Sequence, residues 1–260
     1  MKNLLFYYFL DLDNPSPIVL EEIEYQIKIS LALGWNPKDI LLVSNKKMKY
    51  DNIRSTIVKF PKFDCGKWVY KLLGLVYIIE KLKIKDIIWY HDCDLIQIEN
   101  LDYKLPEGKD IGILLQPLLS LGCIFFKDTV LDLFKKTVQE MIKEKGYSDE
   151  RYFKRRLKEN RNRFDSINPR YNIGKRKRLK RYQLSKKPII GCHFKFNMSR
   201  RKIGGTIPII AKQAMINSKT KKIFNILKTL WEKNNINYKS FIPKDCLSLL
   251  KSITTGAKAP

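Results

Sequence analysis

The sequence predicts an α/β fold in which a mixed, mostly parallel, Rossmann-like sheet is flanked by helices and followed by a helical C-terminal extension. Two observations lead to this prediction. Short apolar segments alternate with segments of helical periodicity through the first ninety residues, an order typical of strands joined by crossover helices. The apolar segments are also nearly continuous, as in parallel strands that are buried on both faces.

Four strands and two helices are expected in this first part of the chain. Residues 4–10 are an apolar run, and residues 18–33 carry apolar side chains at helical spacing up to Gly34. Residues 67–83 have the same periodicity, which predicts one buried helix face formed by Trp68, Leu72, Leu75 and Ile79. The remaining strands are expected at residues 39–44, 55–60 and 87–90.

The second part of the chain predicts shorter strands and more helix. Ser148 is a candidate N-cap for a helix over residues 149–158. The other expected elements are strands at 111–116, 121–126 and 188–194, and helices at 129–145, 211–235 and 244–252. We therefore expect two domains, an α/β domain over residues 1–200 and a helical extension over residues 201–260 packed on it.

The net charge predicts an anionic partner. The chain carries a formal charge of +25, and residues 151–187 contribute +14 of it through sixteen basic and two acidic residues. Such a stretch suits an anionic membrane surface, a phosphate-rich substrate or a nucleic acid backbone. Aromatic residues interleave with it, as they do in many nucleic acid grooves: Tyr152, Phe153, Phe164, Tyr171 and Tyr182.

Cysteine usage and the lack of long apolar segments predict a cytoplasmic location, with peripheral contact to a membrane. The five cysteines include no C-x-x-C pair, which favours buried thiols in a reducing compartment. No segment approaches the ~20 apolar residues of a membrane span. The apolar run at residues 4–10 is too short for a signal peptide and is followed by Asp11 and Asp13.

The candidate site begins with two carboxylates at the end of the strand expected at 87–90. Side chains alternate along a strand, so Asp92 and Asp94 point the same way. Two carboxylates beside a buried strand are costly unless a cation or a hydrogen-bond network satisfies them. A second Asp-x-Asp pair, Asp11 and Asp13, follows the first strand, so spacing alone does not select one pair.

Three segments together resemble glycosyltransferases of the GT-A fold that use nucleotide sugars, in the layout of the glycogenin and galactosyltransferase-like families. The first is the Lys-bearing segment GKWVYK at 66–71 leading into IIWYHDCDLI at 87–96, which is similar to the family's DxD motif. The second is SDERYF at 148–153. The third is NPRYN at 168–172 followed by IIGCHF at 189–194. The resemblance covers residues 1–200.

The resemblance implies a metal-dependent transfer of a sugar from a nucleotide diphosphate sugar, such as a UDP-sugar, to a hydroxyl on a glycan, protein or lipid-linked acceptor. Mn²⁺ or Mg²⁺ would be held by Asp92, Asp94 and His193, which suits a hard cation better than zinc. The resemblance also implies five donor-binding residues, namely Asp11, Lys67, Lys71, Asp92 and Asn172. Two acids, Asp149 and Glu150, would act on the acceptor.

Two other functions stay open at the level of the sequence. A metal-dependent nuclease or nucleotidyltransferase would use the Asp pair for metal and the basic stretch for nucleic acid, but Glu99 is the one further carboxylate close to the pair. A non-catalytic basic module that binds nucleic acid or a membrane needs neither the Asp pair nor His193. The sequence favours the transferase and leaves the sugar, the acceptor and the stereochemistry open.

Overall fold

The computed structural model divides the chain into two compact units, each of which is described by itself. Unit 1 comprises Met1–Ser16, Asn36–Cys93 and Asp102–Asn168, and unit 2 comprises Pro17–Trp35, Asp94–Leu101 and Pro169–Pro260. The structure describes residues 1–115, 119–173, 188–193, 200–233, 237–246 and 248. The domain boundary expected at residue 200 stays a prediction.

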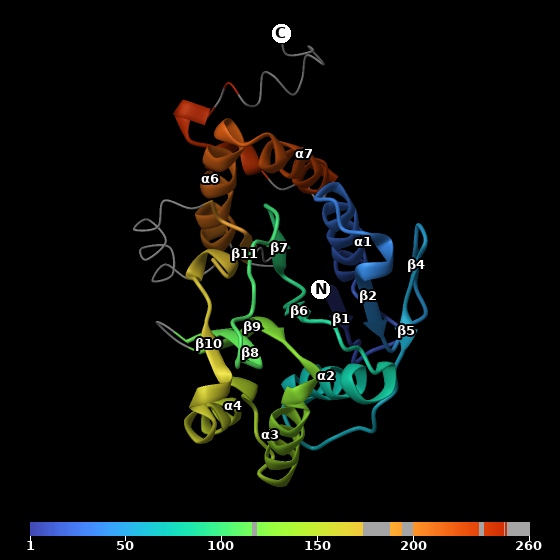
Figure 1. Cartoon of the computed structure of the whole chain (residues 1–260). Helices are drawn as coiled ribbons and strands as arrows, with labels where there is room; N and C mark the ends of the chain where they lie inside the picture. The colour runs from blue at the N-terminus through green and yellow to red at the C-terminus, as the bar shows by residue number, and fades with distance from the viewer. Residues whose placement is uncertain (116–118, 174–187, 194–199, 234–236, 247, 249–260) are drawn as a thin grey trace. The chain divides into compact units, whose positions relative to one another are not determined.

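Unit 1 is built on a sheet of seven described strands in the order β10-β8-β9-β6-β1-β2-β5 (Figure 1). Strand β1 runs parallel to both of its neighbours, β2 and β6, and β5 continues the parallel pairing beyond β2. Strand β9 is antiparallel to β6 and β8, so the sheet is mixed, as predicted. The strands are β1 (Lys2–Tyr7), β2 (Ile40–Ser44), β5 (Thr56–Ile57), β6 (Ile88–His91), β8 (Ile111–Leu114), β9 (Ser120–Phe126) and β10 (Phe164–Ser166).

One expected strand of unit 1 is divided. The segment expected as a single strand at 55–60 contains only the short β5, and β4 (Ile53–Arg54) precedes it and pairs antiparallel with β3 (Lys49–Tyr50). The Ser55 side chain accounts for the break, because its hydroxyl accepts a hydrogen bond from the Met48 amide at 2.8 Å and donates to the Lys46 carbonyl at 3.1 Å. A side chain that bonds the local backbone competes with continued strand pairing.

Three helices pack with the sheet of unit 1, namely α2 (Trp68–Leu82), α3 (Leu131–Lys143) and α4 (Asp149–Glu159), and α3 lies between the other two (Figure 1). The apolar face of α2 joins the core through Val69, Leu72 and Leu75. The expectation for Trp68 is wrong, because 42% of this residue is exposed. Trp68 is the first residue of α2, at the end of the helix, and does not join the core.

Unit 2 collects α1 (Pro17–Ala32), β7 (Leu95–Gln97), β11 (Gly191–His193), α6 (Arg200–Ile216) and α7 (Ser218–Lys233). Strand β11 is antiparallel to β7, and α1 packs with α7. The core of this unit joins Ile29 of α1 and Leu33, the residue after α1, to Phe224 and Trp231 of α7. The C-terminal helices thus share a core with an N-terminal helix.

The helix expected at 211–235 is two helices. The break lies at Asn217, whose side-chain oxygen accepts hydrogen bonds from the amides of Lys219 at 2.9 Å and Thr220 at 3.1 Å and so caps α7. The helix expected at 244–252 begins as a 3-10 turn over Lys244–Cys246, and most of the rest lies outside the described residues. None of the described helices is both long and apolar enough to cross a membrane.

Candidate functional site

The carboxyl end of β6 holds Asp92 in a defined position. The Asp92 amide donates to the Gly122 carbonyl at 3.0 Å, which continues the pairing of β6 with β9 beyond the strand. The Tyr90 hydroxyl donates to Asp92 Oδ1 at 3.0 Å. Burial, followed by the charge of Asp92, raises the pKa of Tyr90 well above its ordinary value, so this hydroxyl remains a donor.

Lys71 of α2 lies between two carboxylates. Its Nζ forms an ion pair with Asp149 Oδ2 and lies 3.6 Å from Asp92 Oδ1, and the residue is only 8% exposed. Burial opposes the charge of the ammonium group. The charges of Asp92 and Asp149 outweigh it and raise the pKa of Lys71 above its ordinary value, so the side chain stays positively charged.

Asp149 is fixed from a second side by the start of α4. Ser148 Oγ accepts a hydrogen bond from the Arg151 amide at 3.3 Å, which confirms the predicted N-cap. Asp149 Oδ1 accepts from the Glu150 amide at 2.9 Å, and the residue is 5% exposed. Acids in the first turn of a helix are also favoured by the helix dipole. Glu150 is half-buried beside it.

Unit 1 thus brings together Asp92, Lys71 and Asp149, three of the predicted site residues from three separate segments. Lys67 is exposed at the start of α2. Asp11 is exposed too, and its Oδ1 accepts from the amides of Asp13 and Asn14, both at 3.1 Å. That is the local turn geometry of an Asx motif, and the contact of Asp11 with a donor stays a prediction.

Unit 2 holds Asp94, which directly precedes β7. Strand β11 pairs with β7 in a register that sets His193 opposite Leu95, the residue after Asp94. The main chains of Asp94 and His193 are therefore neighbours across two strands, although the His193 side chain lies outside the described residues. Asn172, also in this unit, is fully buried, and its amide donates to the Pro169 carbonyl at 2.9 Å.

Glu22 of α1 is a residue that the sequence did not single out. Burial, followed by the charge of Asp94, raises the pKa of Glu22 to about 8. Its neighbours in the sequence are typical of an amphipathic helix, so no sequence signal marks it. Two carboxylates that oppose each other's charge are the oxygen-donor chemistry that a hard cation such as Mn²⁺ or Mg²⁺ neutralises. Glu22 and Asp94 are oxygen donors of this kind, and among the described side chains no group of three His, Cys, Asp or Glu residues could hold a metal ion.

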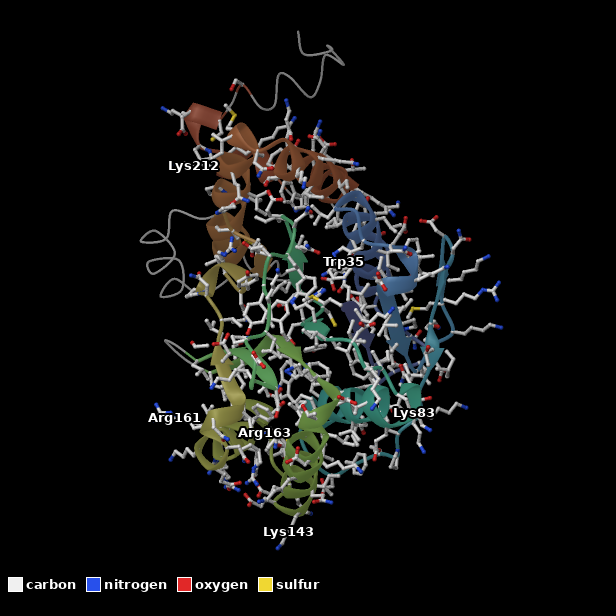
Figure 2. All side chains as sticks on the ribbon, in the orientation of Figure 1. Trp35, Lys83, Lys143, Arg161, Arg163 and Lys212 are labelled. Carbon is white, nitrogen blue, oxygen red and sulfur yellow. The ribbon has the colours of Figure 1, made fainter. Side chains whose placement is uncertain are left out.

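Part of the basic stretch at 151–187 is neutralised inside unit 1. Arg156 pairs with Glu140 at 2.7 Å and Glu159 at 2.9 Å, and Arg163 pairs with Asp110 at 2.7 Å and Asp132 at 2.9 Å. Arg161, by contrast, points outward (Figure 2). Residues 174–187 lie outside the described residues, so contact with a membrane or nucleic acid stays a prediction.

Comparison with known proteins identifies the fold. No protein-family model and no curated protein sequence matches the chain. A glycosyltransferase involved in the glycosylation of the major capsid of PBCV-1 superposes with a TM-score of 0.50 at 10% identity, over 78% of this chain and 97% of that one. The glycosyltransferase GlyE of Streptococcus pneumoniae TIGR4 superposes with a TM-score of 0.51 at 13% identity, over 100% of this chain and 64% of that one.

This chain has a GT-A-like glycosyltransferase fold. The prediction of a mixed, mostly parallel α/β sheet of this type is confirmed. The GT-A-like fold accounts for the position of Asp92, because in open α/β sheets the carboxyl ends of the strands are where ligands bind. At these identities the likeness concerns the fold, and chemistry has to be argued from the residues.

Proposed function

We propose that this protein is a metal-dependent glycosyltransferase that moves a sugar from a nucleotide diphosphate sugar to a hydroxyl on a glycan, protein or lipid-linked acceptor. The observation that carries the proposal is the register of β11 on β7, which sets His193 opposite the residue that follows Asp94. These two residues are nearly one hundred positions apart in the sequence, and both were expected to bind the same cation.

Asp94 and His193 would hold Mn²⁺ or Mg²⁺, with Asp92 as a further contact. The ion would act as a Lewis acid on the leaving nucleoside diphosphate. Glu22 supports this assignment, because the charge of Asp94, after burial, helps to raise its pKa to about 8, and a cation beside both carboxyl groups would offset the contribution of Asp94.

Lys71 acts as a positioning residue in this proposal. Its Nζ is buried against Asp149 and lies 3.6 Å from Asp92, so it neutralises both carboxylates and fixes their separation. A preorganised charge costs no rearrangement when the reaction occurs. Glu150, which is half-buried next to Asp149, is the carboxylate best suited to accept a hydrogen bond from the acceptor hydroxyl.

Donor binding tests the proposal. The protein is mixed with Mn²⁺ and a panel of UDP-, GDP- and dTDP-sugars, and thermal shift and release of nucleoside diphosphate are measured. We expect at least one nucleotide sugar to stabilise the protein in the presence of Mn²⁺. Asp94→Asn, which removes the charge and keeps the shape of the side chain, should abolish that stabilisation.

Asp86→Asn is the matched control, since Asp86 is exposed and lies just before β6, at the opposite end of that strand from Asp92. It should bind the donor as the wild type does. Failure of every nucleotide sugar to stabilise the protein, together with Mn²⁺-dependent cleavage of DNA, would refute the transferase in favour of a nuclease. Binding that survives Asp94→Asn would refute the site assignment.

A further inference from the structure

Trp68 is exposed beside the carboxylate cluster of unit 1. It is 42% exposed, whereas Trp89 and Trp231 are fully buried. Its ring lies 5.2 Å from Nζ of Lys71, the same atom that pairs with Asp149. Aromatic surface beside a few converging polar side chains is the combination that ligand sites use, and Trp68 supplies it next to Lys71 and Asp149.

Tyr147 brings a second exposed aromatic residue to the same edge of unit 1. It is 77% exposed. The Gly66 amide donates to the Gly146 carbonyl at 2.9 Å, and a Cβ added to Gly66 would lie 2.6 Å from Tyr147 Cα. The chain before α2 and the chain before α4 are therefore in direct backbone contact, and Trp68 and Tyr147 follow this contact within two residues in their respective segments.

The charges around Trp68 indicate what kind of ligand fits. Two ammonium groups lie within 5.3 Å of the ring centre, those of Lys67 and Lys71. Three carboxylates act on Lys71, namely Asp92, Asp149 and Glu150. In the proposed function Asp92 contacts the metal ion, which leaves two ammonium groups and two carboxylates whose charges cancel. This balance suits a neutral ligand whose hydroxyls donate to carboxylates while an apolar face covers the indole.

We propose that Trp68, together with Tyr147 of the adjoining segment, forms a carbohydrate-binding platform that holds a sugar ring of the acceptor next to Asp149 and Glu150. A pyranose has both required properties, an apolar C–H face and a rim of hydroxyl groups. Ligand sites combine aromatic surface with a few converging polar groups in this way. The inference deepens the proposed function and rests on it for the identity of the ring as acceptor.

The four tryptophans allow a direct test by nitrogen-labelled NMR of their indole N–H signals. The Trp68 signal is assigned from Trp68→Tyr, and the protein is titrated with lactose, maltose, cellobiose and diacetylchitobiose. We expect at least one of these sugars to shift the Trp68 signal while the signals of Trp89 and Trp231 stay in place. Trp68→Ala should weaken that sugar about 10-fold or more, whereas Trp68→Tyr should stay within about 3-fold of the wild type.

Ile57→Ala is the matched control, because Ile57 is another exposed apolar residue of unit 1, 40% exposed on β5. It should leave sugar binding unchanged. The inference is overturned if none of the four sugars shifts the Trp68 signal, if Trp68→Ala binds as well as the wild type, or if UDP alone shifts that signal. A sugar-dependent shift without any nucleotide-sugar binding would refute the proposed transferase and leave the platform standing.

Discussion

Replacing Lys71 by Met removes one positive charge from between two carboxylates. The wild-type ammonium group is 8% exposed, pairs with Asp149 and lies 3.6 Å from Asp92. Methionine has a similar length, so the change deletes the charge while it keeps most of the packing of the side chain at position 71. The variant is therefore left with two carboxylates near the core and no opposite charge between them.

The expected loss is large for a single substitution. Removing one partner of a buried ion pair typically costs about 3–5 kcal/mol of the free energy of unfolding. Asp149→Asn should cost less, about 1–3 kcal/mol, because Lys71 then still has Asp92 as its partner. The double variant should be destabilised by less than the sum of the two single losses, and the difference should be at least about 1 kcal/mol. The reason is that the second change removes a group that the first left unpaired.

Urea unfolding followed by tryptophan fluorescence measures these differences as shifts of the midpoint. Lys67→Met is the matched control, because Lys67 is exposed one turn before Lys71, and it should stay within about 0.5 kcal/mol of the wild type. The raised pKa of Lys71 also fixes the sign of the pH dependence. Its contribution is fully present below the ordinary value of 10.5 and is lost as the pH rises through the higher folded value.

The difference between wild type and Lys71→Met should therefore stay level from about pH 6 to about pH 9. Two results would refute this account of Lys71. One is a strictly additive double variant, which would mean that Lys71 and Asp149 do not interact. The other is a Lys71→Met loss no larger than that of Lys67→Met, which would mean that the buried charge contributes nothing measurable.

Three further predictions concern the surroundings of the site. Ser148→Ala should lower the free energy of unfolding by about 1 kcal/mol, because it removes the N-cap of α4. Amide hydrogen exchange should increase mainly in that helix, and a uniform increase across the chain would contradict this prediction. Gly66→Ala should destabilise by about 1–3 kcal/mol in urea, since the new Cβ meets the backbone of Tyr147, and an unchanged midpoint would speak against that contact. Cys192 is fully buried, with a pKa raised by burial, so mass spectrometry should find it alkylated only after unfolding, whereas the half-buried Cys65 should react in the native protein.

The individual elements were largely predictable because periodicity reports burial. The predictions at 39–44, 67–83 and 149–158 correspond to β2, α2 and α4 within a few residues. The order of the strands was not predictable in the same way. Strand β9 lies antiparallel between β6 and β8, and this depends on which apolar faces meet in three dimensions rather than on any local pattern.

The site residues likewise divide into those that the sequence could single out and those that depend on three-dimensional packing. The Asp pair could be singled out because it follows an apolar strand, and Asp149 and His193 because their segments resemble those of the GT-A family. The partner of Lys71 could not, because an ion pair between α2 and α4 depends on how those helices pack. The exposure of Trp68 escaped for a related reason, since a helical wheel does not show that the first turn extends past the core.

The shared core of unit 2 has a consequence for synthesis. Ile29 of α1 packs in one cluster with Phe224 and Trp231 of α7, so the two helices that need each other are made roughly 200 residues apart. At about 5–20 residues per second, the ribosome needs on the order of 10–40 s to supply the second after the first. Throughout that interval the apolar face of α1 has no native partner from α7, which makes it the segment of the nascent chain where we expect chaperones to bind.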